Sequence, residues 1–235
     1  MLLAIDVGNS NIVFGLYNGK KMVKTWRCET IDFKIPAIKA KISAVIIASV
    51  VPQVDKKLKE QLIRKFGIQP YFVTAKNIKG LNIKLRKLNE IGADRVVDAL
   101  AAYKIYGGPV IVVDFGTATT FDLISAKGEY LGGAIAPGIT MARDALHTKT
   151  AKLPQIELKA PKNIVGHDTI SAMQSGLVYG YAAMVDGMVG RLGKEKKVIA
   201  TGGLARLVCK YTTVVDRIDT ELTLKGLRMI GETLK

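Results

Sequence analysis

Two short segments of the chain combine residue types that can bind phosphate. Asp6-Val7-Gly8-Asn9-Ser10 and Asp114-Phe115-Gly116-Thr117 each follow an apolar run and place a glycine two residues after an aspartate. Glycine lets backbone N–H groups converge on an anion because no Cβ obstructs the approach, and a neighbouring carboxylate can hold the accompanying metal ion. A single turn of this kind closes many ordinary hairpins. Two of them favour paired phosphate-binding turns in an ATP-dependent small-molecule kinase.

The elements that must position these turns occur twice along the chain. Placing Asp6 over Asp114, an offset of 108 residues, also superposes Gly8 on Gly116. Each turn stands between an apolar strand and a return strand, and a second turn and a third strand follow. We therefore predict two similar α/β lobes, residues 1–107 with the first turn and residues 108–235 with the second.

Hydrophobic spacing and turn residues predict the remaining elements. We expect strands over residues 1–7, 12–17, 22–28, 44–51, 110–113, 119–125 and 130–135. We expect helices over residues 34–42, 53–66, 92–106 and 169–192. Residues 198–209 read as a strand, a Gly-Gly turn and the start of a helix, and that turn could pack against the adenosine part of a nucleotide.

The composition is that of a soluble globular protein, with 49% apolar and 23% charged residues. Residues 1–5 are apolar but are interrupted by Asp6 and lack a basic lead, so we expect no signal peptide. No run approaches the roughly 18 apolar residues that span a bilayer, so we expect no membrane partner. Cys28 and Cys209 lie far apart without C-x-x-C spacing. This favours a reducing cytoplasm over a zinc site or a disulfide framework.

Much of the net charge of +15 falls in residues 33–89, which hold thirteen Lys and Arg against Asp55 and Glu60. Such a field could attract nucleic acid or raise the local concentration of anionic small molecules. The basic residues alternate with Ile, Leu and Val, as on ordinary amphipathic elements, and few aromatic residues interleave them. A solvated basic face is therefore the favoured interpretation, and nucleic acid is not an expected partner.

Taken in order, the segments DVGNSN, GADR, DFGTATTFD, GGAIAPG, MQSG and ATGGLA resemble type III pantothenate kinase. This family belongs to the acetate and sugar kinase/Hsp70/actin superfamily, and the resemblance runs from about residue 2 to about residue 230. GADR, followed about twenty residues later by DFGTATTFD and then GGAIAPG, is close to a fingerprint of the family. The resemblance implies an α/β fold of two similar ribonuclease H-like lobes, each a mixed sheet flanked by helices.

The resemblance also implies a reaction and its site residues. The γ-phosphoryl group of ATP would pass to the primary hydroxyl of pantothenate, the first step toward coenzyme A, with Asp94 as general base. Mg²⁺ and a monovalent cation (potassium or ammonium), the latter held by Asp114, are the implied metal ions, and a homodimer is the implied assembly. The implied ATP contacts are Asp6, Val7, Gly8, Asn9, Ser10, Asn11, Ile12, Val13 and Thr117. The implied acceptor contacts are Gly92, Ala93, Asp94, Arg95 and Thr169.

Each of these residue types also has a structural interpretation. Asp94 can orient an attacking hydroxyl while ionised, because phosphoryl transfer depends mostly on positioning and charge neutralisation, but it could equally cap the helix that follows. Arg95 suits a carboxylate through bidentate hydrogen bonds, or it could pair with Glu90 or Asp98 on the surface. Thr169 could cap the long helix, as could the aspartate before it.

One segment departs from the family pattern. Just before GADR the family commonly shows a Tyr-Asp-Asn-Pro run, where this chain has Leu85-Arg86-Lys87-Leu88. The tyrosine that often lines the acceptor pocket is therefore missing, as are the turn-forming Asn and Pro. The departure keeps open a kinase of the same superfamily that acts on another small hydroxy acid. The basic segment keeps open a nucleic-acid-binding regulator on the same fold.

Overall fold

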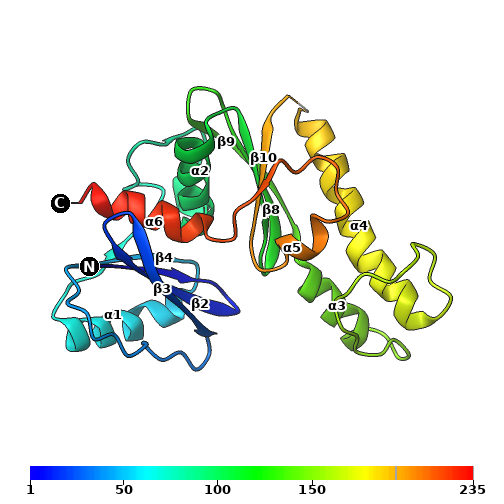
Figure 1. Cartoon of the computed structure of the whole chain (residues 1–235), viewed down its shortest axis with the longest axis horizontal. Helices are drawn as coiled ribbons and strands as arrows, with labels where there is room; N and C mark the ends of the chain where they lie inside the picture. The colour runs from blue at the N-terminus through cyan, green and yellow to red at the C-terminus, as the bar shows by residue number, and fades with distance from the viewer. Residues whose placement is uncertain (194, 235) are drawn as a thin grey trace. The chain divides into compact units, whose positions relative to one another are not determined.

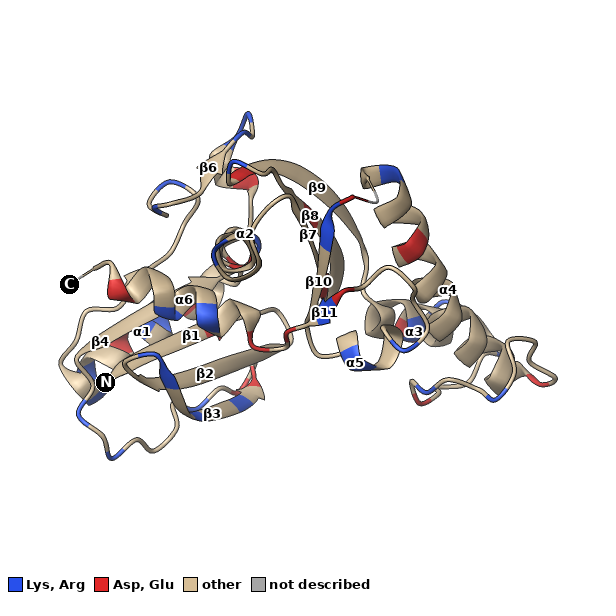
Figure 2. Ribbon diagram, turned by 45° about the horizontal axis from the view of Figure 1, so that its top comes forward, with Lys and Arg blue, Asp and Glu red and all other residues tan. Residues whose placement is uncertain are grey.

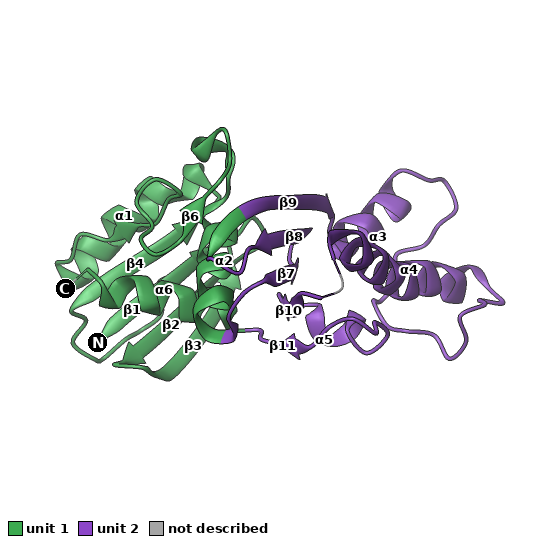
Figure 3. Ribbon diagram, turned by 90° about the horizontal axis from the view of Figure 1, so that it is seen from above, with its two compact units in different colours: residues 1–105, 128–130, 221–235 green, residues 106–127, 131–220 purple. Residues whose placement is uncertain are grey.

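The computed structural model of the chain describes residues 1–193 and 195–234 and divides into two compact units (Figure 3). Unit 1 comprises residues 1–105, 128–130 and 221–235, and unit 2 comprises residues 106–127 and 131–220. No helix in these described ranges is long and apolar enough to cross a membrane.

Unit 1 is built on a five-stranded mixed sheet with the strand order β3-β2-β1-β4-β5 (Figure 1). Its first three strands form an antiparallel meander, and β4 and β5 add to it in parallel. The strands are β1 (Leu2–Val7), β2 (Asn11–Asn18), β3 (Lys21–Glu29), β4 (Ala44–Ser49) and β5 (Tyr71–Phe72). The helices beside them are α1 (Pro52–Phe66), α2 (Ala93–Tyr106), whose last residue belongs to unit 2, and α6 (Leu222–Glu232).

Strand alternation sorts the side chains of this sheet onto two faces. The odd-numbered residues of β1 pack in one cluster with Leu58 and Leu62 of α1. The other face carries the even-numbered residues, including Asp6, and α6 covers it (Figure 1). A Cβ on Gly231 of α6 would lie 2.9 Å from Leu2, and one on Gly226 would lie 2.6 Å from Val97 of α2. The glycines of α6 therefore permit close packing against the sheet and against α2.

Unit 2 repeats this sheet with the order β9-β8-β7-β10-β11. Its strands are β7 (Val110–Phe115), β8 (Ala118–Ile124), β9 (Glu129–Pro137), β10 (Lys197–Thr201) and β11 (Arg217–Ile218), and its helices are α3 (Ile139–Thr148), α4 (Thr169–Leu192) and α5 (Ala205–Val208). The first two residues of β9 belong to unit 1, where they pair in parallel with β6 (Asn82–Ile83). A 3₁₀ helix, η1 (Leu88–Glu90), follows β6.

Five strands of the second sheet match the first sheet in order, since β1, β2, β3, β4 and β5 correspond to β7, β8, β9, β10 and β11, and β6 is added at the outer edge of β9. The predicted α/β fold of two similar mixed-sheet lobes is thereby confirmed. Asp6 and Asp114 occupy the same place, on the central strand immediately before the turn. In unit 1 this aspartate lies on the sheet face opposite the residues that pack with α1, and in unit 2 on the face opposite those that pack with α4.

The helix predicted over residues 34–42 is wrong. The segment is extended, and Phe33 and Ile42 at its two ends are buried in the α1-facing cluster, with Ile35 and Ile38 packed against it. Pro36 lacks a backbone N–H and disfavours helical geometry in the residue before it. The apolar residues therefore serve as anchors of an extended segment rather than as one face of a helix.

The predicted strands and the other predicted helices are present, with ends that coincide or are shifted by at most two residues, while β5, β6, η1, α3, β11 and α6 were not predicted. The division at residue 107 stays a prediction about the lobes. Compact packing places residues 128–130 and α6 in unit 1. Figure 2 shows Lys and Arg positions on many elements of both units rather than on one helix.

Candidate active site

The turn between β1 and β2 is held in shape by its own backbone and by β3. The N–H of Gly8 donates to the carbonyl of Asn11 at 3.0 Å, which closes the turn. Thr30, which is buried, donates its hydroxyl to the carbonyl of Gly8 at 2.7 Å and its N–H to the carbonyl of Ser10 at 3.1 Å. Thr30 was not singled out in the sequence, because only the pairing of β2 with β3 brings it to this turn.

The predicted ATP-binding stretch is not uniformly accessible. The side chains of Val7 and Ile12 are buried in the α1-facing cluster, so only their backbone could contact a ligand. Asn9 and Ser10 are exposed at the tip of the turn, and Asp6 is half-buried on the face that α6 covers. The part of this stretch that can meet a phosphate is therefore the turn itself together with Asp6.

The start of α2 abuts the end of the sheet that carries this turn. The N–H of Val50, just beyond β4, donates to the carbonyl of Val7 at 3.1 Å, and a Cβ on Gly92 would lie 3.2 Å from Val50 Cγ1. The same Cβ would lie 2.4 Å from Oδ1 of Asp94, well inside contact distance. Gly92 therefore has to be a glycine for the carboxylate to occupy this position.

Asp94 is the second residue of α2, and its Oδ1 accepts the backbone N–H of Arg95 at 2.7 Å. Its carboxylate thus satisfies one donor of the first helical turn, as the capping interpretation allows. The Asp94 carboxylate lies at the same end of the first sheet as the Asp6 turn, because Val50 contacts both Val7 and Gly92. Unit 1 consequently brings together the predicted phosphate turn and the predicted general base.

Arg95, the residue after Asp94, borders an open pocket of about 300 Å³ within unit 1. Arg95 lines it together with residues of the segment that departs from the family pattern. Its lining residues are Leu85, Arg86, Lys87, Glu90, Ile91 and Arg95. Lys87 Nζ and Glu90 Oε1 form an ion pair of 2.7 Å at its rim. The predicted acceptor residue Arg95 therefore faces a basic cavity.

A further polar pair at this end of the sheet was not predicted. Ser49, at the end of β4, donates its hydroxyl to Oδ1 of Asp55 in α1 at 2.5 Å and accepts the N–H of Val51 at 3.2 Å. Burial raises the pKa of the Asp55 carboxyl, and the hydrogen bond from Ser49 acts in the opposite direction. Val51 caps α1 without a side-chain hydrogen bond. The Ser49–Asp55 pair therefore fixes the first turn of α1 beside β4.

In unit 2, two glycines pack directly on the carboxylate of Asp114. A Cβ on Gly116 would lie 3.0 Å from Asp114 Oδ2, and one on Gly202 would lie 2.3 Å from Oδ1 and 2.7 Å from the backbone nitrogen of Phe115. Gly202 also has φ +89°, a conformation that residues with a Cβ rarely adopt. The Gly-Gly turn after β10, predicted from sequence as a separate element, thus lies against the second aspartate turn.

Thr117 lies in the same turn, and its carbonyl accepts the N–H of Gly138 at 3.1 Å. A Cβ on Gly138 would lie 2.1 Å from that carbonyl oxygen. The turn is therefore braced by the start of α3, much as the first turn is braced by Thr30.

The register around Asp114 gathers oxygen groups on one face of the sheet. Thr120 pairs with Asp114 across β8, and Thr201 pairs with it across β10. Residues paired in this way project to the same face. No group of three or more His, Cys, Asp or Glu side chains in the described residues could hold a metal ion. The Thr120 hydroxyl also donates to Oδ2 of the buried Asp122 at 3.1 Å. Oxygen ligands of this kind fit a hard cation better than a transition metal.

Thr169 is the first residue of α4, and the preceding residue provides the cap. Asp168 Oδ1 accepts the N–H of Ser171 at 2.9 Å, and these two residues form a capping box. Hydrogen bonds from Ser171 lower the pKa of the Asp168 carboxyl. The hydroxyl of Thr169 is thus not the cap of this helix, and its side chain is exposed.

Comparison with known proteins agrees with the two-unit fold and its turns. Residues 2–191 match the family model described as type III pantothenate kinase. The type III pantothenate kinase of Moorella thermoacetica is 43% identical over 257 aligned residues, which cover 99% of each chain. A Campylobacter jejuni protein described as a Baf family transcriptional activator has a TM-score of 0.65 at 24% identity, covering 99% of this chain and 98% of that chain.

The ADPNP-bound activator of 2-hydroxyisocaproyl-CoA dehydratase from Clostridium difficile has a TM-score of 0.53 at 15% identity, covering 98% of this chain and 92% of that chain. These two structural likenesses concern the fold alone. The family model and the sequence relative together assign the chain, which belongs to the type III pantothenate kinase family.

Proposed function

We propose that Asp94 is the general base in the reaction to which family membership assigns this chain, the ATP-dependent phosphorylation of pantothenate. This reaction is the first step of coenzyme A biosynthesis. The observation that carries the proposal is the bare Cα of Gly92, which leaves room for the Asp94 carboxylate at the end of the sheet where the Asp6 turn lies.

Asp94 does not need to be a strong base for this role. In phosphoryl transfer the acceptor hydroxyl loses its proton late, so a carboxylate that orients the hydroxyl and then takes its proton is sufficient. The bond from the N–H of Arg95 occupies one lone pair of Oδ1. A carboxylate offers about four acceptor sites, so this one bond does not prevent it from also accepting a hydroxyl.

The Asp6 turn would bind the triphosphate of ATP. Its exposed tip at Asn9 and Ser10 offers backbone N–H groups and short polar side chains, and Gly8 keeps the backbone open. Asp6 would lie near the Mg²⁺ that accompanies the phosphates. When bound, that ion neutralises charge on the transferring phosphoryl group. Thr30 supports this role indirectly, since its two hydrogen bonds keep the turn in one conformation.

In unit 2, we assign Thr117 to ATP and Asp114 to a monovalent cation, potassium or ammonium. The hydroxyls of Thr120 and Thr201 in register with Asp114 support a site made of oxygen ligands. A cation bound there would neutralise the Asp114 carboxylate. The turns that contain Gly116 and Gly202 could then approach the phosphates of a nucleotide.

Arg95 and Thr169 complete the proposed acceptor contacts. The guanidinium of Arg95 lines the pocket beside Asp94, where it suits the carboxylate of pantothenate. Thr169 is exposed at the start of α4, and Asp168 already provides the cap, which leaves the Thr169 hydroxyl available to a ligand.

A homodimer and a cytoplasmic location also belong to this proposal. Unit 2 exposes large apolar side chains on β9, on α3 and around the start of α4, which a second copy would cover. These residues are Leu131, Ile135, Met141, Ile164, Val165 and Ile170. Light scattering would give twice the monomer mass, and an Ile135→Asp variant would give the monomer mass. Both cysteines are free thiols, which suits a reducing compartment.

The decisive experiment measures ADP release from ATP with pantothenate, in sodium or in potassium as the sole monovalent cation. We expect potassium-dependent turnover that falls at least about 100-fold in Asp94→Asn, as for loss of a positioned base. Full activity in Asp94→Asn would remove Asp94 from the mechanism. Equal rates in sodium and potassium would remove the cation site.

A further inference from the structure

The pocket that Arg95 lines has a charge pattern suited to an anion. Three cationic side chains, Arg86, Lys87 and Arg95, line it against the single carboxylate of Glu90, which gives a net formal charge of +2. Leu85 and Ile91 supply an apolar part of the wall. Such a cavity suits a small molecule with an apolar body and one negatively charged end.

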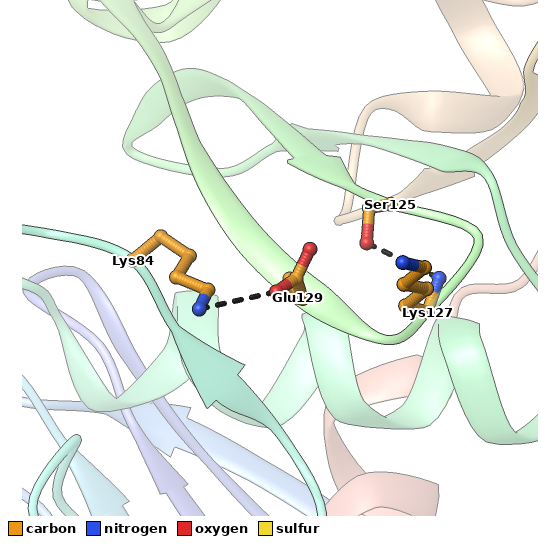
Figure 4. Close-up of polar contacts among 4 residues, drawn as sticks. All are labelled: Lys84, Ser125, Lys127 and Glu129. Carbon is orange, nitrogen blue, oxygen red and sulfur yellow. Dashed lines mark hydrogen bonds and ion pairs between the residues drawn. The ribbon is translucent and has the colours of Figure 1, made fainter.

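The basic residues around this pocket are not equivalent. Lys87 is engaged with Glu90 at 2.7 Å. Lys84 extends toward Glu129, with Nζ 3.1 Å from Oε1, and does not line the pocket (Figure 4). Arg86, by contrast, makes no hydrogen bond or ion pair with any residue that the structure describes. Its guanidinium therefore lines the cavity with its donors uncommitted.

Secondary structure fixes the backbone on either side of Arg86. Before it, the N–H of Asn82 donates to the carbonyl of Gly128 at 3.2 Å, and the N–H of Lys84 donates to that of Tyr130 at 2.9 Å. After it, the N–H of Glu90 donates to the carbonyl of Lys87 at 3.3 Å in η1. The segment that carries Arg86 is thus a short link between two anchored points, so the backbone holds this exposed residue at the pocket.

We propose that Arg86 is a specificity-determining residue that, with Arg95, binds the carboxylate of the acceptor. A guanidinium presents paired N–H donors that match the two oxygens of a carboxylate, and two guanidinium groups can hold one carboxylate from different sides. This inference rests on the proposed function, because it gives the acceptor's hydroxyl to Asp94 and its carboxylate to this pocket.

This role for Arg86 gives residues 85–88 a function in acceptor recognition. Where the family commonly shows Tyr-Asp-Asn-Pro, this chain has an apolar wall residue at Leu85 and a cation at Arg86. The enzyme should therefore depend more on the negative charge of its acceptor than on aromatic contact with it. A neutral analogue that keeps the hydroxyl should be a poor substrate for the wild type.

The test compares pantothenate with its neutral primary amide as acceptors for the wild type, Arg86→Ala and Arg86→Lys. We expect Arg86→Ala to raise the KM for pantothenate about tenfold or more with little change in kcat, because a charge-assisted hydrogen bond is lost. Its kcat/KM for the amide should stay within about twofold of the wild type. The KM of Arg86→Lys for pantothenate should lie between those of the wild type and Arg86→Ala, since lysine keeps the charge and loses the paired donors.

Lys84→Ala is the matched control, because it removes a cation of the same segment that lies outside the pocket. It should leave both acceptors unaffected. An unchanged KM for pantothenate in Arg86→Ala, or an equal loss of kcat/KM for the acid and the amide, would overturn the inference.

Calorimetric binding of pantothenate without ATP separates the role of Arg86 from the proposed reaction. Weaker binding in Arg86→Ala alone supports the role of Arg86, and equal binding overturns it. Absence of ADP release in the wild type would overturn only the proposed reaction.

Discussion

The phenolic hydroxyl of Tyr106 donates a hydrogen bond of 2.8 Å to Oδ2 of Asp219. Asp219 is buried, and its own N–H donates to the carbonyl of Ala200 at 2.8 Å. Lys197 Nζ donates to the carbonyl of Tyr106 at 2.8 Å. Tyr106 begins unit 2, and Asp219 lies one residue before its last residue. The bond therefore ties the two ends of unit 2 to each other.

Tyr106→Phe should lower the free energy of unfolding by about 1.5–3 kcal/mol, the range for a hydrogen bond to a charged group. Urea unfolding at pH 8 would measure it. Tyr103→Phe is the control on the same helix, because the Tyr103 hydroxyl makes no hydrogen bond in the described part of the chain. Equal stability of the two variants would show that the Tyr106–Asp219 bond contributes nothing.

The same bond predicts a loss of stability in alkaline solution. Burial, together with the hydrogen bond and the charge of Asp219, raises the pKa of Tyr106 from 10.0 to about 12. Because the pKa is raised in the folded state, the contribution of the Tyr106–Asp219 bond to the free energy of unfolding is complete below pH 10. It disappears as the pH rises to about 12. Thermal unfolding should show a drop over this interval in the wild type that is smaller in Tyr106→Phe.

Gly92→Ala should reduce kcat at least about 100-fold, because the added Cβ displaces the carboxylate of a positioned base. The clash is with Asp94 Oδ1, at 2.4 Å. Steady-state ADP release would measure it, and thermal unfolding would show whether the variant stays folded. Gly176→Ala is the control, because a Cβ at this helical position meets nothing within 4 Å. It should keep full activity and gain about 0.5–1 kcal/mol of stability. Full activity in Gly92→Ala would contradict the assignment of Asp94.

Gly202→Ala should abolish activation by potassium. Its Cβ would press on Asp114 Oδ1 at 2.3 Å, and φ +89° adds backbone strain. Measuring ADP release against potassium concentration would show a flat response at a low rate. A normal potassium response in a folded Gly202→Ala protein would place the cation elsewhere.

Ser49→Ala should destabilise the protein more at pH 7 than near pH 3.5. Burial raises the pKa of Asp55, so the fold favours the neutral carboxyl, and this contribution is lost as the pH rises through the folded-state pKa. The hydrogen bond from Ser49 acts on the charged form, so its removal matters most when Asp55 is ionised, by about 1 kcal/mol. Urea unfolding at both pH values would test it. A loss that is independent of pH would contradict this account.

The repeated strands and turns could be predicted from the sequence because their signals are local. A nearly continuous apolar run defines each of β1 and β7, and Gly8 and Gly116 mark the turns that follow them. The helix predicted over residues 34–42 failed because Ile35 and Ile38 are anchored by residues far away in sequence. Periodicity alone does not distinguish such anchors from one face of a helix.

The parts of the candidate site that escaped prediction depend on register. Thr120 and Thr201 become neighbours of Asp114 only through the pairing of β7 with β8 and β10. Thr30 reaches the first turn only through the pairing of β2 with β3. The pocket residue Arg86 stood out in the sequence as a departure from the family pattern, but its uncommitted guanidinium is visible only in the structure.

The position of α6 has a consequence for how the protein is made. This helix covers the face of the first sheet that carries Leu2 and Asp6, and its glycines lie against Leu2 and Val97. All of unit 2 leaves the ribosome before α6 does, so unit 2 can begin to fold while the first sheet still lacks the helix that covers one of its faces. Of the two units, the one that starts earlier along this sequence is therefore completed later.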